Sequence, residues 1–262
     1  MYIADNSMEI EKSTIQKTQV YKPDGTIISG ESRIITEHSL QVMVNERLAF
    51  RLVCTPDRLK ELVVGRLLTE GIVTHIGDME QLYICDSGHT ARVFLKTSVE
   101  EPWFLPKDRP TEPTCCTNNI IYLRRAGQRY ATLEKVDWQP EWVFSMAKAF
   151  KEDSAIHKTT WGTHSCYLGV AGDIVFSAED IGRHNAMDKV IGHAAFKEIP
   201  FQKCMLFTTG RVPVDMVMKA IAAGMPVLVS KAVPTMEAVA LAKEYGLTLI
   251  CKAWPDQFEV FT

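Results

Sequence analysis

The chain has 262 residues, of which 46% are hydrophobic and 23% are charged, and its formal net charge is −3. This composition is typical of one large or two modest globular domains, and the small negative charge argues against binding to nucleic acid or to an anionic membrane. The first residues hold acids and no apolar signal-peptide core, and no apolar run approaches the ~20 residues of a membrane span, so we expect a soluble, cytoplasmic protein.

The first 100 residues show the short alternating patterns of β-strands. Strands are predicted over residues 17–22, 31–36, 39–44 and 47–54, and near 80–85 and 91–96. One helix is expected between them, with Thr55 as its N-cap, Pro56 at its first position and Gly71 after its last turn. These elements predict a β-rich N-terminal domain over residues 1–100 with one helix.

Residues 101–119 contain four prolines and little periodicity, which predicts a connecting loop. This loop carries two adjacent cysteines, Cys115 and Cys116, with Lys107 and Arg109 close in sequence. Nearby cations lower the pKa of an exposed thiol and make it a better sulfur nucleophile. Two interpretations stay open, a sulfur-carrying cysteine on a long loop and an incidental pair. Most of the seven cysteines are expected to be reduced, because the number is odd and the spacing irregular.

From about residue 141 onward, strands alternate with helices of about ten residues. Helices are predicted over 141–152, from about His184, over 213–223 and over 235–245, with strands between them. This alternation indicates βαβ units on a sheet with a substantial parallel portion. We therefore predict an α/β domain over residues 120–262.

Three polar junctions follow strands of this domain, at residues 179–185, 208–211 and 230–235. Ligands of open α/β sheets lie beyond the carboxyl ends of strands, where helix N-termini favour anions. The candidate ligand residues are Arg183, His184, Asn185, Thr209, Gly210, Arg211 and Lys231. Three coincident junctions favour a phosphate-like ligand, although any α/β protein has polar loops of this kind. His164, beside a strand, is a further candidate or a structural residue.

Several familiar sites are missing from the sequence. No C-x-x-C pair supports zinc, and no H-x-E with P-C-x-x-C supports a zinc nucleobase deaminase, so no metal site is predicted. The chain also lacks the G-x-G-x-x-G dinucleotide fingerprint and the G-x-S-x-G elbow of serine hydrolases. What remains is a thiol pair on a loop beside an anion-binding α/β domain.

Three stretches, GRLLTEGI, EDIGRHNAMDKVIG and TTGRVPVDMVMKAIAAGMPVLVSKAVPT, occur in the order found in the formate dehydrogenase accessory sulfurtransferases. The chain resembles this FdhD/NarQ family from about residue 40 to the C-terminus. The resemblance implies that the second half has a three-layer α/β/α, cytidine-deaminase-like fold without zinc ligands. It also implies a cytoplasmic homodimer.

The same resemblance implies a sulfur carrier required for formate dehydrogenase activity. Such a protein accepts persulfide sulfur from a cysteine desulfurase and passes it to molybdenum bis-molybdopterin guanine dinucleotide, which it binds as cargo for the formate dehydrogenase apoprotein. The family's persulfide cysteine matches Cys115, with Cys116 as the second candidate. Many members have C-x-x-C here, whereas this chain has Asn118 at the position of the second cysteine.

The family's C-terminal cofactor-binding segment also has a counterpart in this chain. It matches Lys252, Ala253, Trp254, Pro255, Asp256 and Gln257, with the last two replacing a glycine-arginine pair of some relatives. Two rival hypotheses accompany sulfur transfer. One is a non-catalytic chaperone that binds and delivers the molybdenum cofactor, and the weaker one is a vestigial deaminase-like hydrolase.

Overall fold

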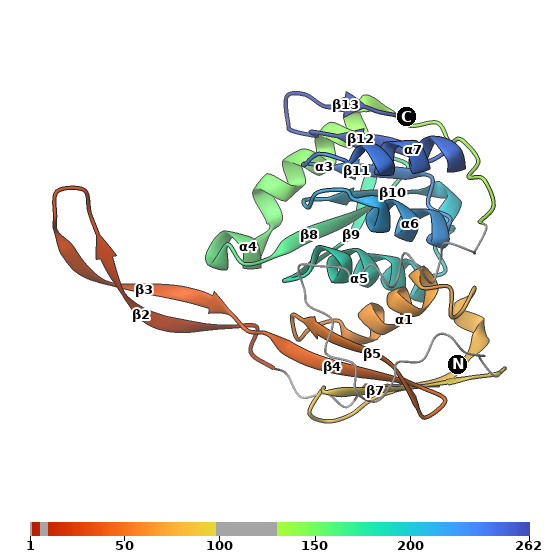
Figure 1. The fold of residues 1–262 in the computed structure, drawn as a ribbon, viewed down its shortest axis with the longest axis horizontal. Helices are drawn as coiled ribbons and strands as arrows, with labels where there is room; N and C mark the ends of the chain where they lie inside the picture. The colour runs from red at the N-terminus through yellow and green to blue at the C-terminus, as the bar shows by residue number, and fades with distance from the viewer. Residues whose placement is uncertain (1, 6–9, 98–129) are drawn as a thin grey trace.

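The computed structural model describes residues 2–5, 10–97 and 130–262 (Figure 1). In the first half, five strands form one sheet in the order β1-β6-β7-β4-β5, and β2 and β3 form a separate two-stranded hairpin. The elements of this half are β1 (Tyr2–Asp5), β2 (Ser13–Tyr21), β3 (Ile27–Ile35), β4 (His38–Val44), β5 (Arg47–Cys54), α1 (Leu59–Thr69), β6 (Met79–Ile84) and β7 (Thr90–Leu95).

The second half is built on a six-stranded sheet in the order β13-β12-β11-β10-β8-β9. Its strands are β8 (His164–Val170), β9 (Asp173–Asp180), β10 (Cys204–Thr208), β11 (Val227–Ser230), β12 (Thr248–Cys251) and β13 (Glu259–Val260). Its helices are α3 (Pro140–Asp153), α4 (Ala155–Thr160), α5 (Arg183–Phe196), α6 (Val214–Ala223) and α7 (Met236–Tyr245). Because β10, β11 and β12 are parallel, the predicted parallel portion is confirmed.

Helices cover both faces of this sheet, because side chains alternate between the faces along each strand. Leu206 and Leu228 point into a core shared with α5, α6 and α7, whereas Phe207 and Val229 point into a second core beneath α3. The mixed α/β class is confirmed. The cytidine-deaminase-like assignment concerns a likeness to another family and stays a prediction.

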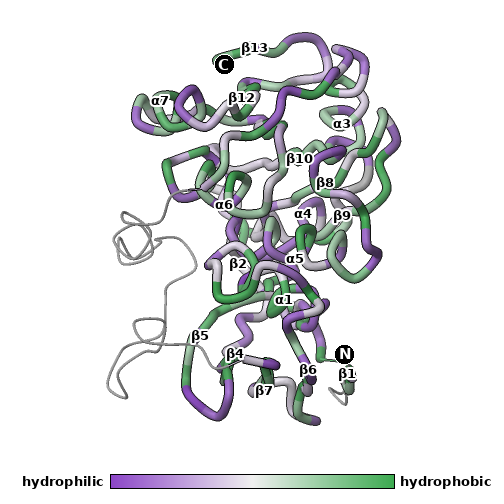
Figure 2. Tube along the Cα trace, turned by 90° about the vertical axis from the view of Figure 1, so that its right-hand side faces the viewer, coloured by the Kyte–Doolittle hydropathy of each residue, from purple (hydrophilic) through white to green (hydrophobic). Residues whose placement is uncertain are grey.

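Helices α1 and α5 lie between the two sheets (Figures 1 and 2). The two helices cross in close contact at Gly65 of α1 and Gly192 of α5. A Cβ atom on Gly65 would lie 1.8 Å from the carbonyl oxygen of Asp188, and one on Gly192 would lie 1.9 Å from that of Glu61. Only glycine allows this approach, and one buried apolar core runs through both halves. The predicted domain boundary at 101–119 lies outside the described residues and stays a prediction.

The predicted helix ends of the second half are confirmed to within two residues, and local chemistry explains them. Helix α3 begins with Pro140, whose fixed φ suits the first helical position. Helix α7 is capped by Thr235, whose Oγ1 accepts a hydrogen bond from the Ala238 amide at 3.2 Å. Gly224 and Gly246 end α6 and α7 with φ angles of 73° and 71°.

The predicted start of α1 is wrong. Thr55 does not cap it; the helix begins at Leu59, after Arg58 in a left-handed conformation. Thr55 instead connects the two halves of the molecule. Its amide donates to Asp180 at 3.0 Å, and its hydroxyl oxygen accepts from the Ile181 amide at 3.1 Å. A local capping pattern cannot foresee such a partner, because it is more than a hundred residues away.

Three short elements, β1, α4 and β13, were not expected from the sequence, because they have two to six residues and too little periodicity to detect. Within the described ranges, none of the helices has both the length and the apolarity needed to cross a membrane.

Candidate functional site

The three polar junctions lie side by side at one edge of the six-stranded sheet. His164 at the start of β8 pairs with Asp180 at the end of β9, and Thr208 at the end of β10 pairs with Ser230 at the end of β11. Strand β8 is antiparallel to β10, so its first residues lie at the same edge. We call this edge, formed by the start of β8 and the ends of β9 to β12, the carboxyl edge.

Backbone contacts hold the second and third junctions together as one unit. The Ser230 hydroxyl donates to the Gly210 carbonyl at 2.7 Å, and the Lys231 amide donates to the Thr208 carbonyl at 3.0 Å. A parallel bridge joins Val212 to Pro234 just beyond. These contacts fix the position of the two junctions relative to each other.

Arg183, from the first junction, lies against Gly210 of the second. A Cβ atom at position 210 would lie 2.7 Å from the Cδ atom of Arg183, so the glycine makes room for the side chain. The Arg183 Nε atom is buried and has no hydrogen-bond partner among the described residues. A buried guanidinium donor at the start of a helix needs an acceptor, and an anionic oxygen satisfies it well.

His184 faces a carboxylate that sequence reasoning missed. Its Nε2 atom lies 3.1 Å from Oδ2 of Asp215, in the first turn of α6. Burial lowers the pKa of His184 although Asp215 opposes the shift, so we expect a neutral ring. Burial alone would raise the pKa of Asp215, but His184 and Arg183 lower it. The only sequence signal was an acid in the first turn of a helix after a polar junction.

His164 lies in the same cluster. Burial, followed by the charge of Arg183, lowers its pKa to about 4, so the ring is neutral at pH 7. Its Nδ1 atom is 3.4 Å from the Thr209 hydroxyl, which also accepts a hydrogen bond from the Ser165 amide at 3.1 Å. Thr209 thus connects β8 to the second junction.

Lys231 lies between two aromatic rings, another arrangement that the sequence did not indicate. Its Nζ atom is 4.7 Å from the ring centroid of Phe150 in α3 and 4.7 Å from that of Trp254. Trp254 is 43% exposed and belongs to the predicted 252–257 segment. The Ala253 amide donates to the Ser230 carbonyl at 3.0 Å, which ties the segment to the carboxyl edge.

Several predicted residues have structural partners. The Asn185 amide donates to the Val53 carbonyl at 2.8 Å and to Asp180 at 3.0 Å, so it links the two halves. The Lys252 ammonium pairs with Glu259 at 2.8 Å on the surface. Arg211, Pro255, Asp256 and Gln257 are exposed along the edge. Their roles in binding stay predictions.

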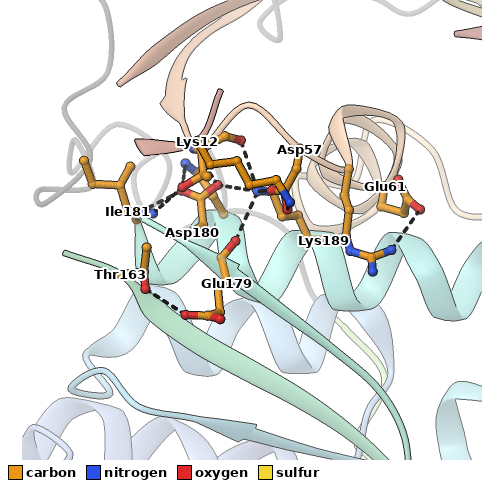
Figure 3. A network of polar contacts seen from close by, with 12 residues as sticks. Lys12, Asp57, Glu61, Thr163, Glu179, Asp180, Ile181 and Lys189 are labelled. Carbon is orange, nitrogen blue, oxygen red and sulfur yellow. Dashed lines mark hydrogen bonds and ion pairs between the residues drawn. The ribbon is translucent and has the colours of Figure 1, made fainter. Parts of the chain in front are cut away.

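A buried ionic network lies beside the start of α5 (Figure 3). The Lys189 Nζ atom is 2.7 Å from Asp180 and 2.7 Å from Asp57, and Asp57 also pairs with Lys12 at 2.9 Å. Burial alone would lower the pKa of Lys189, but Asp180 and Asp57 raise it. The network joins β9, α5 and the segment before α1, so it helps to hold the first junction in place.

Cys115 and Cys116 lie outside the described residues, so their position relative to the carboxyl edge stays a prediction. Among the described cysteines, burial raises the pKa of Cys204 and of Cys251 to about 12, and it also raises the pKa values of Cys54 and Cys166. Cys85 differs: burial would raise its pKa, but hydrogen bonds from Ser87, Thr90 and His89 lower it. A low pKa favours the reactive thiolate, so Cys85 must be controlled in any thiol assay.

Comparisons with known proteins extend over almost the whole chain. The FdhD/NarQ family profile matches residues 35–262. A protein named sulfur carrier protein FdhD from Bacillus pumilus is 28% identical over 243 residues, covering 91% of this chain and 92% of that protein. One of the same name from Staphylococcus haemolyticus is 27% identical over 255 residues, covering 97% of each.

A crystal structure named for a formate dehydrogenase accessory protein from Desulfotalea psychrophila has the same fold. It superposes with a TM-score of 0.78 at 23% sequence identity, covering 96% of this chain and 97% of that one. At this identity the likeness concerns the fold alone.

Proposed function

This chain belongs to the FdhD/NarQ family, and from that premise we propose that it is a sulfur carrier supporting the activity of a formate dehydrogenase. In the full proposal it is a cytoplasmic, homodimeric sulfurtransferase. It accepts sulfur from a cysteine desulfurase on Cys115, with Cys116 as the alternative. It passes that sulfur to the molybdenum bis-molybdopterin guanine dinucleotide that it holds for the apoenzyme.

The observation that carries the binding half of the proposal is the buried, unpaired Nε atom of Arg183 next to Gly210. The pyrophosphate of a guanine dinucleotide supplies anionic oxygens that can satisfy this donor. Lys231 adds a second cation along the edge, and Trp254 offers an exposed aromatic surface suited to a base. The residue chemistry therefore fits a nucleotide cargo.

The proposed transfer has two steps. In the first, the carrier thiolate attacks the terminal sulfur of the desulfurase persulfide and forms a new S–S bond, and the desulfurase cysteine leaves as a thiolate. In the second, the cargo supplies the electron pair for a new bond to that terminal sulfur, so the cargo is formally oxidised by two electrons. The S–S bond breaks at the same time, and the carrier cysteine leaves as a thiolate. Arg183 and Lys231 hold the anionic cargo, while His184 and Asp215, 3.1 Å apart, orient each other beside it.

A first prediction concerns sulfur acceptance. Incubating the protein with an active cysteine desulfurase and cysteine is expected to add one sulfur atom, removable by reductant. The gain should be lost in Cys115→Ala, or in Cys116→Ala if the neighbouring thiol is the carrier. Intact-mass spectrometry measures both. Cys85→Ser is the matched control, because its lowered pKa makes it the described thiol most prone to react, and this variant should keep the gain.

No gain in the wild-type protein would contradict sulfur transfer and favour the non-catalytic chaperone. The chaperone hypothesis also differs from sulfur transfer in what it predicts for a variant without the two cysteines. Under it, a variant lacking both Cys115 and Cys116 still binds the cofactor and still supports formate dehydrogenase maturation. Under sulfur transfer, the same variant binds the cofactor but no longer supports maturation.

A second prediction concerns the anion site. Arg183→Gln is expected to weaken the binding of guanosine diphosphate, used as a probe for the nucleotide end of the cargo, by about 10- to 100-fold. The reason is the loss of a charge-assisted hydrogen bond, which contributes about 1.5–3 kcal/mol. Isothermal titration calorimetry measures the change.

The control for this experiment is Arg92→Gln, which removes an exposed arginine paired with Glu46 in the other sheet. It should leave the dissociation constant within about twofold, because exposed ion pairs contribute little and the residue is far from the carboxyl edge. Equal effects of the two substitutions would count against a site at Arg183.

A further inference from the structure

The β2–β3 hairpin projects from the body of the molecule as a long arm (Figure 1). Nine residue pairs connect its strands, from Ser13 with Ile35 at the base to Tyr21 with Ile27 at the tip, so the arm is about 30 Å long. At the base, Ile35 packs against Gly162, where a Cβ atom would lie 2.9 Å from Ile35 Cγ2. Helix α4 contacts β3, and beyond its base the arm extends away from the body (Figure 1).

This arm holds an unusual share of the exposed apolar surface. Six of the fourteen exposed large hydrophobic residues of the described chain belong to it, namely Ile15, Val20, Tyr21, Ile27, Ile28 and Ile34. Tyr21 is 70% exposed, and Trp161, next to Gly162 at the base of the arm, is 82% exposed. A lone two-stranded ribbon is marginally stable in water, so an arm of this composition is expected to be covered in solution.

The two faces of the arm differ in charge. Directly paired residues share a face, and the charged side chains Lys17, Glu31 and Arg33 all lie on one of them, together with Ile15, Tyr21 and Ile27. Among the nine pairs, the opposite face carries no charged residue. It is formed by the pairs Thr14 with Ile34, Gln16 with Ser32, Thr18 with Gly30, and Val20 with Ile28.

An uncharged face suits a second copy of the same chain. A two-fold interface packs one surface against its own copy, so an uncharged face can be buried there without leaving a charge unpaired. The apolar residues of this face lie at its two ends, Val20 and Ile28 at the tip and Ile34 at the base, with small or polar residues between. An antiparallel arrangement of two arms places the tip of one on the base of the other, so both ends find apolar partners.

We propose that the β2–β3 arm is the dimerisation element of this protein. The uncharged faces of two antiparallel arms pack together about a two-fold axis, and each tip reaches the surface around Trp161 of its partner. This inference deepens the proposed homodimer and rests on it. It names the surface that joins the two copies.

A stable interface of the usual size requires contacts at the body as well as between the two arms. One face of a ribbon about 30 Å long and about 10 Å wide supplies about 300 Å² per protomer. A stable interface buries about 800 Å² per partner, so the packed arms alone fall short. Full overlap of the arms brings each tip to the partner's helix α4, where the exposed Trp161 adds apolar area.

The first test is the mass in solution, measured by sedimentation equilibrium on the full chain. The wild-type protein is expected at twice its 29.5 kDa chain mass. The double variant Val20→Asp and Ile28→Asp should raise the dimer dissociation constant by about 100-fold or more, because it buries carboxylates against the apolar base of the partner arm. The matched control is Val175→Asp, since Val175 is 44% exposed and Val20 is 43% exposed. The control should remain dimeric.

A monomeric wild-type protein would overturn both the homodimer and the arm, and would point to another partner for the arm. A double variant that stays as dimeric as the wild type would overturn the arm alone. Sulfur acceptance is measured separately by mass, so these failures are distinct from failure of the sulfur-carrier proposal.

A second measurement does not depend on a destabilised variant. A photo-crosslinking amino acid, p-benzoylphenylalanine, is placed at position 20, and this protein is mixed with isotopically heavy wild-type chain. Crosslinks between light and heavy chains at the peptides carrying Ile34 or Trp161 are expected. Crosslinks found only within one chain, or only to partner peptides that carry neither Ile34 nor Trp161, would overturn the proposed arrangement.

Discussion

Replacing Lys189 with methionine is expected to lower the free energy of unfolding by about 3–5 kcal/mol. The lysine side chain is fully buried, and its ammonium lies 2.7 Å from both Asp180 and Asp57. Removing it leaves two carboxylates with no cation between them in a region of low dielectric constant, although Asp57 keeps its pairing with Lys12. Denaturant unfolding followed by circular dichroism measures the change.

The control for Lys189→Met is Lys148→Met. Lys148 pairs with Glu152 at 3.9 Å, and both side chains are exposed, so this variant should change stability by less than about 1 kcal/mol. A loss of similar size in both variants would contradict a special role for the buried network.

The stabilising effect of Lys189 also has a defined pH range. Its pKa is raised in the folded state above the ordinary 10.5. The effect is therefore fully present below about pH 10.5 and is lost as the pH rises through the folded-state pKa. Near pH 7, the stability difference between the wild type and Lys189→Met should not vary through deprotonation of this lysine.

The substitution Gly192→Ala is expected to cost about 3 kcal/mol or more, or to prevent folding. Its new methyl group would lie 1.9 Å from the Glu61 carbonyl oxygen, and a helix backbone cannot yield as a flexible side chain does. Helices α1 and α5 would have to separate, and the core shared by the two sheets would open. Gly65→Ala should behave in the same way, since its methyl group would meet the Asp188 carbonyl oxygen at 1.8 Å.

Gly77→Ala is the matched control for both glycine substitutions, because nothing lies within 4 Å of the Cβ position there. The control should keep the wild-type melting temperature to within about 2 °C, since most surface substitutions change stability by at most ~0.5 kcal/mol. Wild-type stability in Gly192→Ala would contradict the close helix crossing.

Much of the local structure could be predicted from the sequence. Helices α3, α6 and α7 were found because periodicity, a proline start and glycine stops are all local signals. The predicted start of α1 is wrong, because the Thr55 hydroxyl accepts a hydrogen bond from the Ile181 amide in the other half of the chain. It does not accept one from the nearest amides of α1. Local capping rules hold where no tertiary contact competes with them.

The candidate site, too, could be predicted from the sequence only in part. The sequence indicated that three polar junctions would share one edge, because the carboxyl ends of parallel strands meet there. It did not indicate Asp215 beside His184, or Phe150 beside Lys231. These pairs come from different elements, and only the packing of helices on the sheet brings them within reach.

The sequence by itself determined the family, the mixed α/β class and the edge at which a ligand is expected, because these follow from motif order, periodicity and strand ends. The tertiary structure alone decided which side chains turn inward. Asn185 and Lys189 share a helix with Arg183, yet they hold the two halves together, while Arg183 keeps an unpaired donor at the carboxyl edge. One helical turn presents side chains in several directions, and the burial of each direction is set by segments far away in the chain.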